Sequence, residues 1–135
     1  MGLDLGQKRV GVARSDETGT IAEAYRTITF ESKAELVTKL RQCVSELGPE
    51  KVVVGLPETL SGKSGPAAEK VRGTVEWLSR EIPGEWVFWD ERLTTAEAER
   101  ILLTADLSRA RRKEVRDKLA AQRILQNYLD RRNNG

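Results

Sequence analysis

The first thirty residues carry the pattern of short strands joined by tight turns. Apolar residues alternate with polar or small ones through 2–13, where a glycine-bounded turn separates two strands. The stretch 16–20 has the composition of a second turn, and β-branched residues are frequent over 21–29. We therefore expect three short strands, of which the third is antiparallel to its neighbour.

From residue 32 onward, a helix pattern is followed by a strand pattern. A helix is predicted between Ser32, which can cap it, and Gly48-Pro49, which would end it. The apolar residues at helical spacing in this helix are Leu36, Leu40, Cys43 or Val44, and Leu47. The continuous apolar run 52–56 is typical of a central parallel strand. Cys43 belongs to the apolar stripe, so we expect it in the core.

The rest of the chain predicts one more strand and three helices. A helix should begin at Pro66 and run to about Arg80, and 86–89 has the pattern of another buried strand. A short helix capped by Thr94 or Thr95 should end at Leu103, and a last helix should span about 112–131. The aromatic residues of the strand are expected in the core: Trp86, Phe88 and Trp89.

The predicted element order is β-β-β-α-β-α-β-α-α. Three antiparallel strands followed by βα units predict an α/β fold with a mixed five-stranded sheet and helices on both faces. The length of 135 residues suits a single domain spanning 1–135.

One carboxylate lies in the middle of the first predicted strand. Alternation places Leu3 and Leu5 on one face and Asp4 on the other, between Gly2 and Gly6. These glycines leave room for another group to approach the carboxylate and the backbone closely. Because an unpaired buried charge is costly, Asp4 should be solvated on an edge strand, paired, or bound to a cation.

Two further acids stand at positions that favour a site. Glu91 follows the 86–89 strand, at the edge of an α/β sheet where ligands usually bind. Asp117 shares one face of the last helix with an apolar stripe that should dock on the sheet. An acid on that face would either pair with a base, such as Arg116, Arg123 or one on a strand, or contribute to a site.

Together, Asp4, Glu91 and Asp117 would form a site of hard oxygen ligands suited to Mg²⁺ or Mn²⁺. Two such ions about 3.5–4 Å apart would stabilise the attacking and leaving oxygens in the hydrolysis of a phosphodiester bond. This chemistry needs no histidine. The chain contains no histidine, which excludes histidine-based triads and histidine zinc ligands.

Composition limits the remaining possibilities. The formal net charge is only +2, so a nucleic-acid-binding surface would have to be local. The single cysteine cannot form an internal disulfide, which fits a reducing compartment. The sequence contains neither an apolar run of bilayer length nor a leader before the first strand, so we expect a soluble, cytoplasmic protein.

Four motifs, in this order and covering nearly the whole chain, resemble the YqgF (RuvX-type) family. They are Gly2-Leu3-Asp4-Leu5-Gly6 with Gly11-Val12-Ala13, Val53-Val54-Gly55-Leu56-Pro57, Asp90-Glu91-Arg92-Leu93-Thr94-Thr95, and Asp117-Lys118-Leu119-Ala120-Ala121 through Leu129. The resemblance implies a ribonuclease H-like fold, with Asp4, Glu91 and Asp117 as catalytic, metal-binding acids. It also implies a nuclease that matures the 5′ end of pre-16S ribosomal RNA during ribosome biogenesis, or that resembles Holliday-junction resolvases.

A basic segment at the last helix is the main candidate for contact with nucleic acid. Residues 109–123 hold seven basic and two acidic side chains. Such a run is either a solvated face or, beside a metal site, a set of phosphate contacts. The predicted nucleic-acid-binding residues are Lys8, Arg9, Lys63, Arg92, Arg109, Arg111, Arg112, Lys113 and Arg116. The substrate would be RNA or DNA, and the protein a monomer or homodimer.

Alternatives to a nuclease place different demands on these residues. The segment 57–64 ends in Gly-Lys-Ser like a phosphate-binding loop, but Pro57, which lacks an amide donor, stands where that loop needs its first glycine. This segment fits either a loop that guides a nucleic-acid backbone through Lys63 or a plain surface loop. The other alternative is a nucleic-acid-binding protein of the same fold with little or no cleavage.

Overall fold

The computed structural model describes residues 1–57, 65–90 and 109–134. Five strands form one mixed sheet in the order β3-β2-β1-β4-β5. β1 (Gly2–Leu5), β2 (Arg9–Ser15) and β3 (Ala22–Thr29) are antiparallel neighbours. β4 (Lys51–Leu56) runs parallel to β1, and β5 (Glu85–Asp90) runs parallel to β4. The predicted mixed five-stranded sheet is confirmed, with β1 and β4 in its interior.

The described helices follow the predicted pattern closely. α1 (Lys33–Leu47) begins where the Ser32 hydroxyl accepts a hydrogen bond from the Glu35 amide at 3.1 Å, and it ends at Gly48, whose φ is 55°. α2 (Pro66–Glu81) has its proline in the first turn, as predicted. α4 (Arg109–Asn134) is longer than the predicted 112–131. The predicted helix 94–103 lies outside the described residues.

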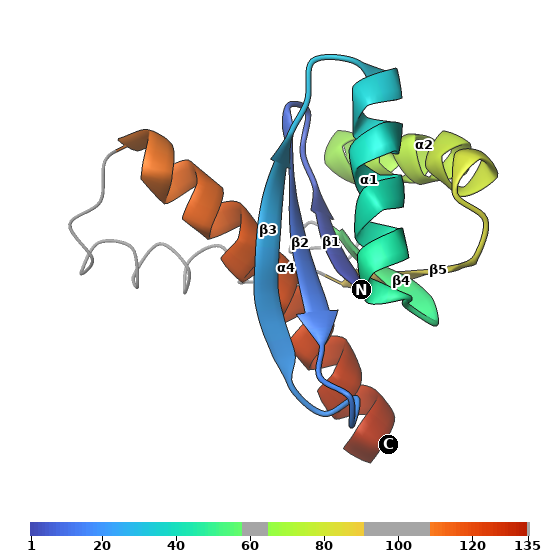
Figure 1. Ribbon diagram of the computed structural model, residues 1–135, viewed down its shortest axis with the longest axis vertical. Coiled ribbons are helices and arrows are strands. Elements are labelled where there is room, and N and C mark those ends of the chain that lie inside the picture. Colours follow the sequence, from blue (N-terminus) through green and yellow to red (C-terminus); the bar gives the residue numbers. More distant parts are fainter. Residues whose placement is uncertain (58–64, 91–108, 135) are drawn as a thin grey trace.

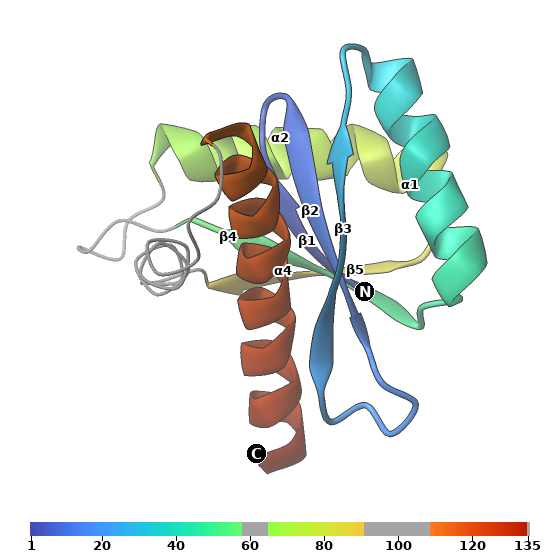
Figure 2. The same ribbon diagram turned by 60° about the vertical axis from the view of Figure 1, so that its left-hand side comes forward.

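Helices cover both faces of the sheet, as Figures 1 and 2 show. On one face, α1 and α2 pack on large aliphatic residues of the strands, among them Leu3, Val10, Val12 and Val54. On the other face, α4 and the strands form a smaller core. The strands contribute Ala13, Ala22 and Val53, and α4 contributes Ala121, Ile124, Leu125 and Leu129. Cys43 is buried in the first core, as predicted. Among the described helices, none has the length and hydrophobicity that a bilayer span requires.

The expectation that the β5 aromatics fill the core is wrong in part. Within the described sheet, β5 pairs with a strand on one side only, and Phe88 is 40% exposed. Trp86 is half-buried at the margin of the first core, where its Nε1 donates to the Ile82 carbonyl at 3.0 Å. Trp89 packs edge-on against Tyr128 of α4, with ring centroids 5.8 Å apart. Trp86 and Trp89 therefore pack at the margins of the two cores, whereas Phe88 is exposed.

Candidate functional site

The backbone of α4 lies against the sheet at two glycines. A Cβ atom added to Gly11 would stand 1.9 Å from the Asp117 carbonyl oxygen, and one added to Gly2 would stand 2.8 Å from the Leu125 Cβ. Real Cβ atoms do not approach other atoms this closely, so only glycine at these positions admits the helix. The space that the sequence predicted beside Asp4 is therefore occupied largely by α4.

The same contact places two carboxylates side by side. Asp4 and Gly11 are direct partners across the β1–β2 ladder, so they share one face of the sheet. The main chain of Asp117 lies on Gly11, which brings that residue next to Asp4. Leu3 and Leu5 contact the α1–α2 core on the opposite face, as the alternation predicted.

Asp4 and Asp117 line one cavity of about 230 Å³. The rest of its lining comes from the β1–β2 hairpin: Gly6, Gln7, Lys8 and Arg9. The hairpin is tight, because the Gly6 amide donates to the Arg9 carbonyl at 2.9 Å and a Cβ at Gly6 would lie 2.6 Å from that oxygen. Both acids are half-buried, and two bases of the hairpin line the cavity with them.

Asp117 also has a basic partner on a strand. The Arg9 Nε atom donates to Asp117 Oδ2 at 2.7 Å, and the side chains are 31% and 17% exposed. A charged hydrogen bond that is partly shielded from water contributes roughly 1–2 kcal/mol. A strand-borne base, which the sequence allowed as a partner of Asp117, is observed, and it lies in the same cavity as Asp4.

Polar side chains fix the position of α4 along β3 and the β2–β3 turn. The Thr27 hydroxyl donates to the Glu114 carbonyl at 2.5 Å. Gln126 accepts from the Ala22 amide at 2.8 Å, and Gln122 donates to the Ala22 carbonyl at 3.0 Å. These bonds lie on both sides of Asp117 along the helix. They therefore fix the register and rotation that direct Asp117 into the cavity.

Five of the basic residues predicted to contact nucleic acid belong to the first turns of α4, which extend beyond the sheet in Figure 1. Arg111, Arg112 and Lys113 are exposed, and Arg116 is half-buried. Cations are disfavoured at a helix N-terminus, because the helix dipole is positive there. The helix dipole therefore does not account for their accumulation at this end of α4.

Several predicted site residues lie outside the described part of the chain: Glu91, Lys63, Arg92 and the side chain of Arg109. Within the described part, no three His, Cys, Asp or Glu side chains gather closely enough to hold a metal ion. The site described here therefore has two of the three predicted acids. Sequence reasoning did not assign a role to Gln7 or to Gly11. The signal for Gly11 was its place across a short hairpin from Asp4.

Comparisons with known proteins agree on one family. The chain matches the family model described as "RuvX: Holliday junction resolvase" over residues 1–131. A protein of Thermoanaerobacter pseudethanolicus named "Putative pre-16S rRNA nuclease" is 48% identical, over 99% of this chain and 97% of the relative. A protein of the same name from Desulforudis audaxviator is 44% identical, over 100% of this chain and 96% of the relative. These matches confirm the resemblance drawn from the four motifs.

Solved structures of low sequence identity show the same fold. Thermus thermophilus RuvC in complex with a Holliday junction substrate superposes with a TM-score of 0.58 at 15% identity, covering 98% of this chain and 94% of that chain. The Fowlpox virus resolvase, in complex with Holliday junction DNA, gives 0.56 at 8% identity, covering 96% and 95%. The predicted ribonuclease H-like fold is confirmed.

Proposed function

The chain belongs to the RuvX family of Holliday junction resolvases, and on this premise we propose that it is a divalent-metal-dependent nuclease that processes the 5′ end of pre-16S ribosomal RNA. The observation that carries the proposal is the cavity in which α4 brings Asp117 beside Asp4. Two acids on a rigid strand and a long helix are held more precisely than acids on loops.

The donor chemistry of this cavity fits Mg²⁺ or Mn²⁺. Both metals prefer carboxylate oxygens and keep several bound waters, so a few acids at an open cavity suffice. We assign Asp4 and Asp117 as ligands and Glu91, which follows β5 in the sequence, as the third. When bound, one or two such ions stabilise charge on the phosphoryl oxygens and supply an activated water.

The remaining residues of the site would bind and orient the nucleic acid. Lys8 and Arg9 stand at the cavity, and exposed Arg111, Arg112 and Lys113 extend from it along α4. Phosphate contacts of this kind position a backbone without reading its sequence. Lys63, Arg92, Arg109 and Arg116 complete the proposed set. The relatives named for pre-16S rRNA favour an RNA substrate, whereas the family description favours a DNA junction.

The test is cleavage of three labelled substrates: an RNA containing the 5′ leader of 16S ribosomal RNA, a single-stranded DNA, and a four-way DNA junction. Each is incubated with the protein in Mn²⁺ and in excess chelator. We expect cleavage of the RNA in Mn²⁺ only. Asp4→Asn should reduce the rate by at least about 100-fold, as expected when an interaction made in the transition state is lost.

The matched control is Asp130→Asn, which makes the same change on the exposed side of α4, where Asp130 accepts a hydrogen bond from Gln126. It should leave cleavage near the wild-type rate. Full cleavage in chelator would overturn the metal mechanism. Cleavage of the junction alone would show that the substrate is DNA and not RNA. Tight binding without cleavage of any substrate would favour the nucleic-acid-binding alternative.

A further inference from the structure

We propose that Arg9 acts as a counter-ion of Asp117 that competes with a divalent cation for this carboxylate and so lowers the affinity of the site for metal. The proposal rests on the proposed function, since it concerns the same two acids. Binding of an ion at Asp117 would require the guanidinium to leave that carboxylate. The free protein would therefore exist with the charge of Asp117 paired internally, and metal would bind by exchange.

The geometry places the guanidinium where a ligand oxygen is needed. Arg9 Nε lies 2.7 Å from Asp117 Oδ2, on the carboxylate that lines the cavity with Asp4. A carboxylate can accept several bonds, but a second cation at this group would face the guanidinium directly. Because like charges at such separations repel strongly where water is partly excluded, the ion and the Arg9 side chain compete for Asp117.

The pair also reduces the repulsion between two acids that line one cavity. Asp4 and Asp117 lie on elements held together by the core beneath α4 and by the bonds of Thr27, Gln122 and Gln126. Their charges repel each other, and a guanidinium between the hairpin and the helix offsets that repulsion. Arg9 is thus suited to stabilise the site before metal binds.

Arg9 has the freedom that an exchange requires. Its backbone is held at the base of the hairpin by the Gly6 amide and by pairing with Thr29, while its side chain is 31% exposed at the open cavity. A guanidinium released from Asp117 would remain at the rim, where it can form paired hydrogen bonds with a phosphate. Lys8 lines the same cavity without a described bond to Asp117, which makes it the matched control.

The first measurement is the affinity for Mn²⁺ by isothermal titration calorimetry, without nucleic acid. Arg9→Gln removes the competing charge and should tighten Mn²⁺ binding about 5- to 20-fold, the range expected for a lost charged hydrogen bond. Lys8→Gln removes an equal charge from the same cavity and should change the affinity by no more than about 2-fold, as expected for a screened charge. Arg9→Lys retains a positive charge and should bind Mn²⁺ nearly as weakly as the wild type.

The second measurement separates this role from a structural one. In chelator, Arg9→Gln should melt at a lower temperature than the wild type, because Asp117 loses its counter-ion. In saturating Mn²⁺ the difference should nearly vanish, since the wild type has then given up the same bond. If Arg9 only ties α4 to the hairpin, the difference will persist in Mn²⁺.

The outcomes distinguish this proposal from the one on which it rests. An unchanged or weaker Mn²⁺ affinity in Arg9→Gln, or an equal gain in Lys8→Gln, would overturn the role of Arg9 while leaving a metal site in place. Failure of the wild type to bind Mn²⁺ at all would overturn both proposals.

Discussion

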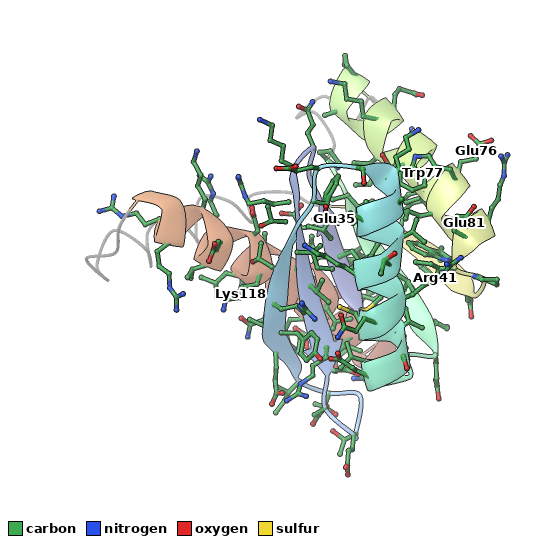
Figure 3. The ribbon with its side chains drawn as sticks, turned by 45° about the horizontal axis from the view of Figure 1, so that its top comes forward. Glu35, Arg41, Glu76, Trp77, Glu81 and Lys118 are labelled. Atoms are coloured by element: carbon green, nitrogen blue, oxygen red, sulfur yellow. The ribbon has the colours of Figure 1, made fainter. Side chains whose placement is uncertain are left out.

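The two faces of the sheet differ in the size and polarity of the side chains that pack against the helices. The face covered by α1 and α2 is filled with large aliphatic side chains, and its helices are joined at the surface by contacts such as the Arg41–Glu81 ion pair at 3.2 Å, with Lys33 beside the Trp77 ring. Figure 3 shows Arg41, Trp77 and Glu81 together on these two helices. The face covered by α4 has glycine and alanine where the helix crosses, polar bonds along β3, and the two acids.

The difference indicates a division of labour between the faces. Burial of large apolar side chains is the main source of folding stability, so the α1–α2 face should dominate the free energy of unfolding. Small residues on the α4 face contribute less to that free energy, but they let the helix backbone lie on the strands. The predicted site residues that the structure describes belong to the α4 face or to the hairpin beside it.

A cavity in the α1–α2 core should give the largest loss of stability and leave the site intact. Leu40 is fully buried in that core, and Leu40→Ala should lower the free energy of unfolding by about 2–5 kcal/mol. Urea unfolding measures the loss, and the rise in melting temperature caused by Mn²⁺ measures the site. If this variant also loses its response to Mn²⁺, the two faces are not independent.

Enlarging the contact on the α4 face should lower the stability less than the core cavity does, but it should disrupt the site. Gly11→Ala puts a methyl group against the backbone of Asp117, which cannot move aside as a flexible side chain would. We expect a loss of roughly 1–3 kcal/mol together with loss of the Mn²⁺ response, because Asp117 is displaced from Asp4. The control is Gly73→Ala on α2, where the added Cβ meets nothing within 4 Å. A Gly11→Ala variant with normal Mn²⁺ binding would contradict the placement of Asp117.

Removing the bases at the start of α4 should weaken nucleic-acid binding and its dependence on salt. For Arg111→Ala/Arg112→Ala/Lys113→Ala, each lost phosphate contact should reduce the slope of log affinity against log salt by about 0.7–0.9. The matched control replaces three bases on the α1–α2 face: Lys33, Arg41 and Arg80. Fluorescence anisotropy across a salt series gives both slopes. Equal slopes of log affinity against log salt in the two variants would indicate that the α4 bases form an ordinary solvated surface.

The smallest effect is expected at the β2–β3 turn, beside the C-terminal end of α4. The amide of Ile21, with the Thr18 hydroxyl and the Thr20 amide, holds the pKa of Asp16 below its ordinary value of 3.8. A lowered carboxyl pKa stabilises the fold above the ordinary value, and this contribution is lost as pH falls through the folded pKa. Asp16→Asn should therefore melt slightly below the wild type at pH 7, with a difference that shrinks toward pH 2–3 in thermal melts.

Much of the fold could be predicted because periodicity reports directly on burial. The alternation around Asp4, the capped helix after Ser32 and the apolar stripe of the last helix each appear in the structure nearly as predicted. The position of β5 at the sheet edge could not be predicted the same way, since a run of aromatic residues is equally compatible with a central strand. Its neighbours depend on strand order, which local pattern does not encode.

The acids of the candidate site could be predicted from the sequence, but the residues that surround them could be predicted less well. Asp4 stood out because a charge in an apolar strand is costly, and Asp117 because it interrupts an apolar helix face. The bond between Arg9 and Asp117 joins residues 108 positions apart, so only the packing of α4 on β2 reveals it.

The most direct test of the proposed metal site is the Mn²⁺-induced rise in melting temperature of the wild type, Asp117→Asn and Asp130→Asn. A ligand that binds only the folded protein raises its melting temperature, so the shift reports binding without reference to substrate. The wild type and Asp130→Asn should show equal shifts. Asp117→Asn should lose most of its shift, with only a modest change in chelator, where loss of the Arg9 bond and relief of repulsion from Asp4 oppose each other. A full Mn²⁺ shift in Asp117→Asn would contradict the assignment of this acid to the metal site.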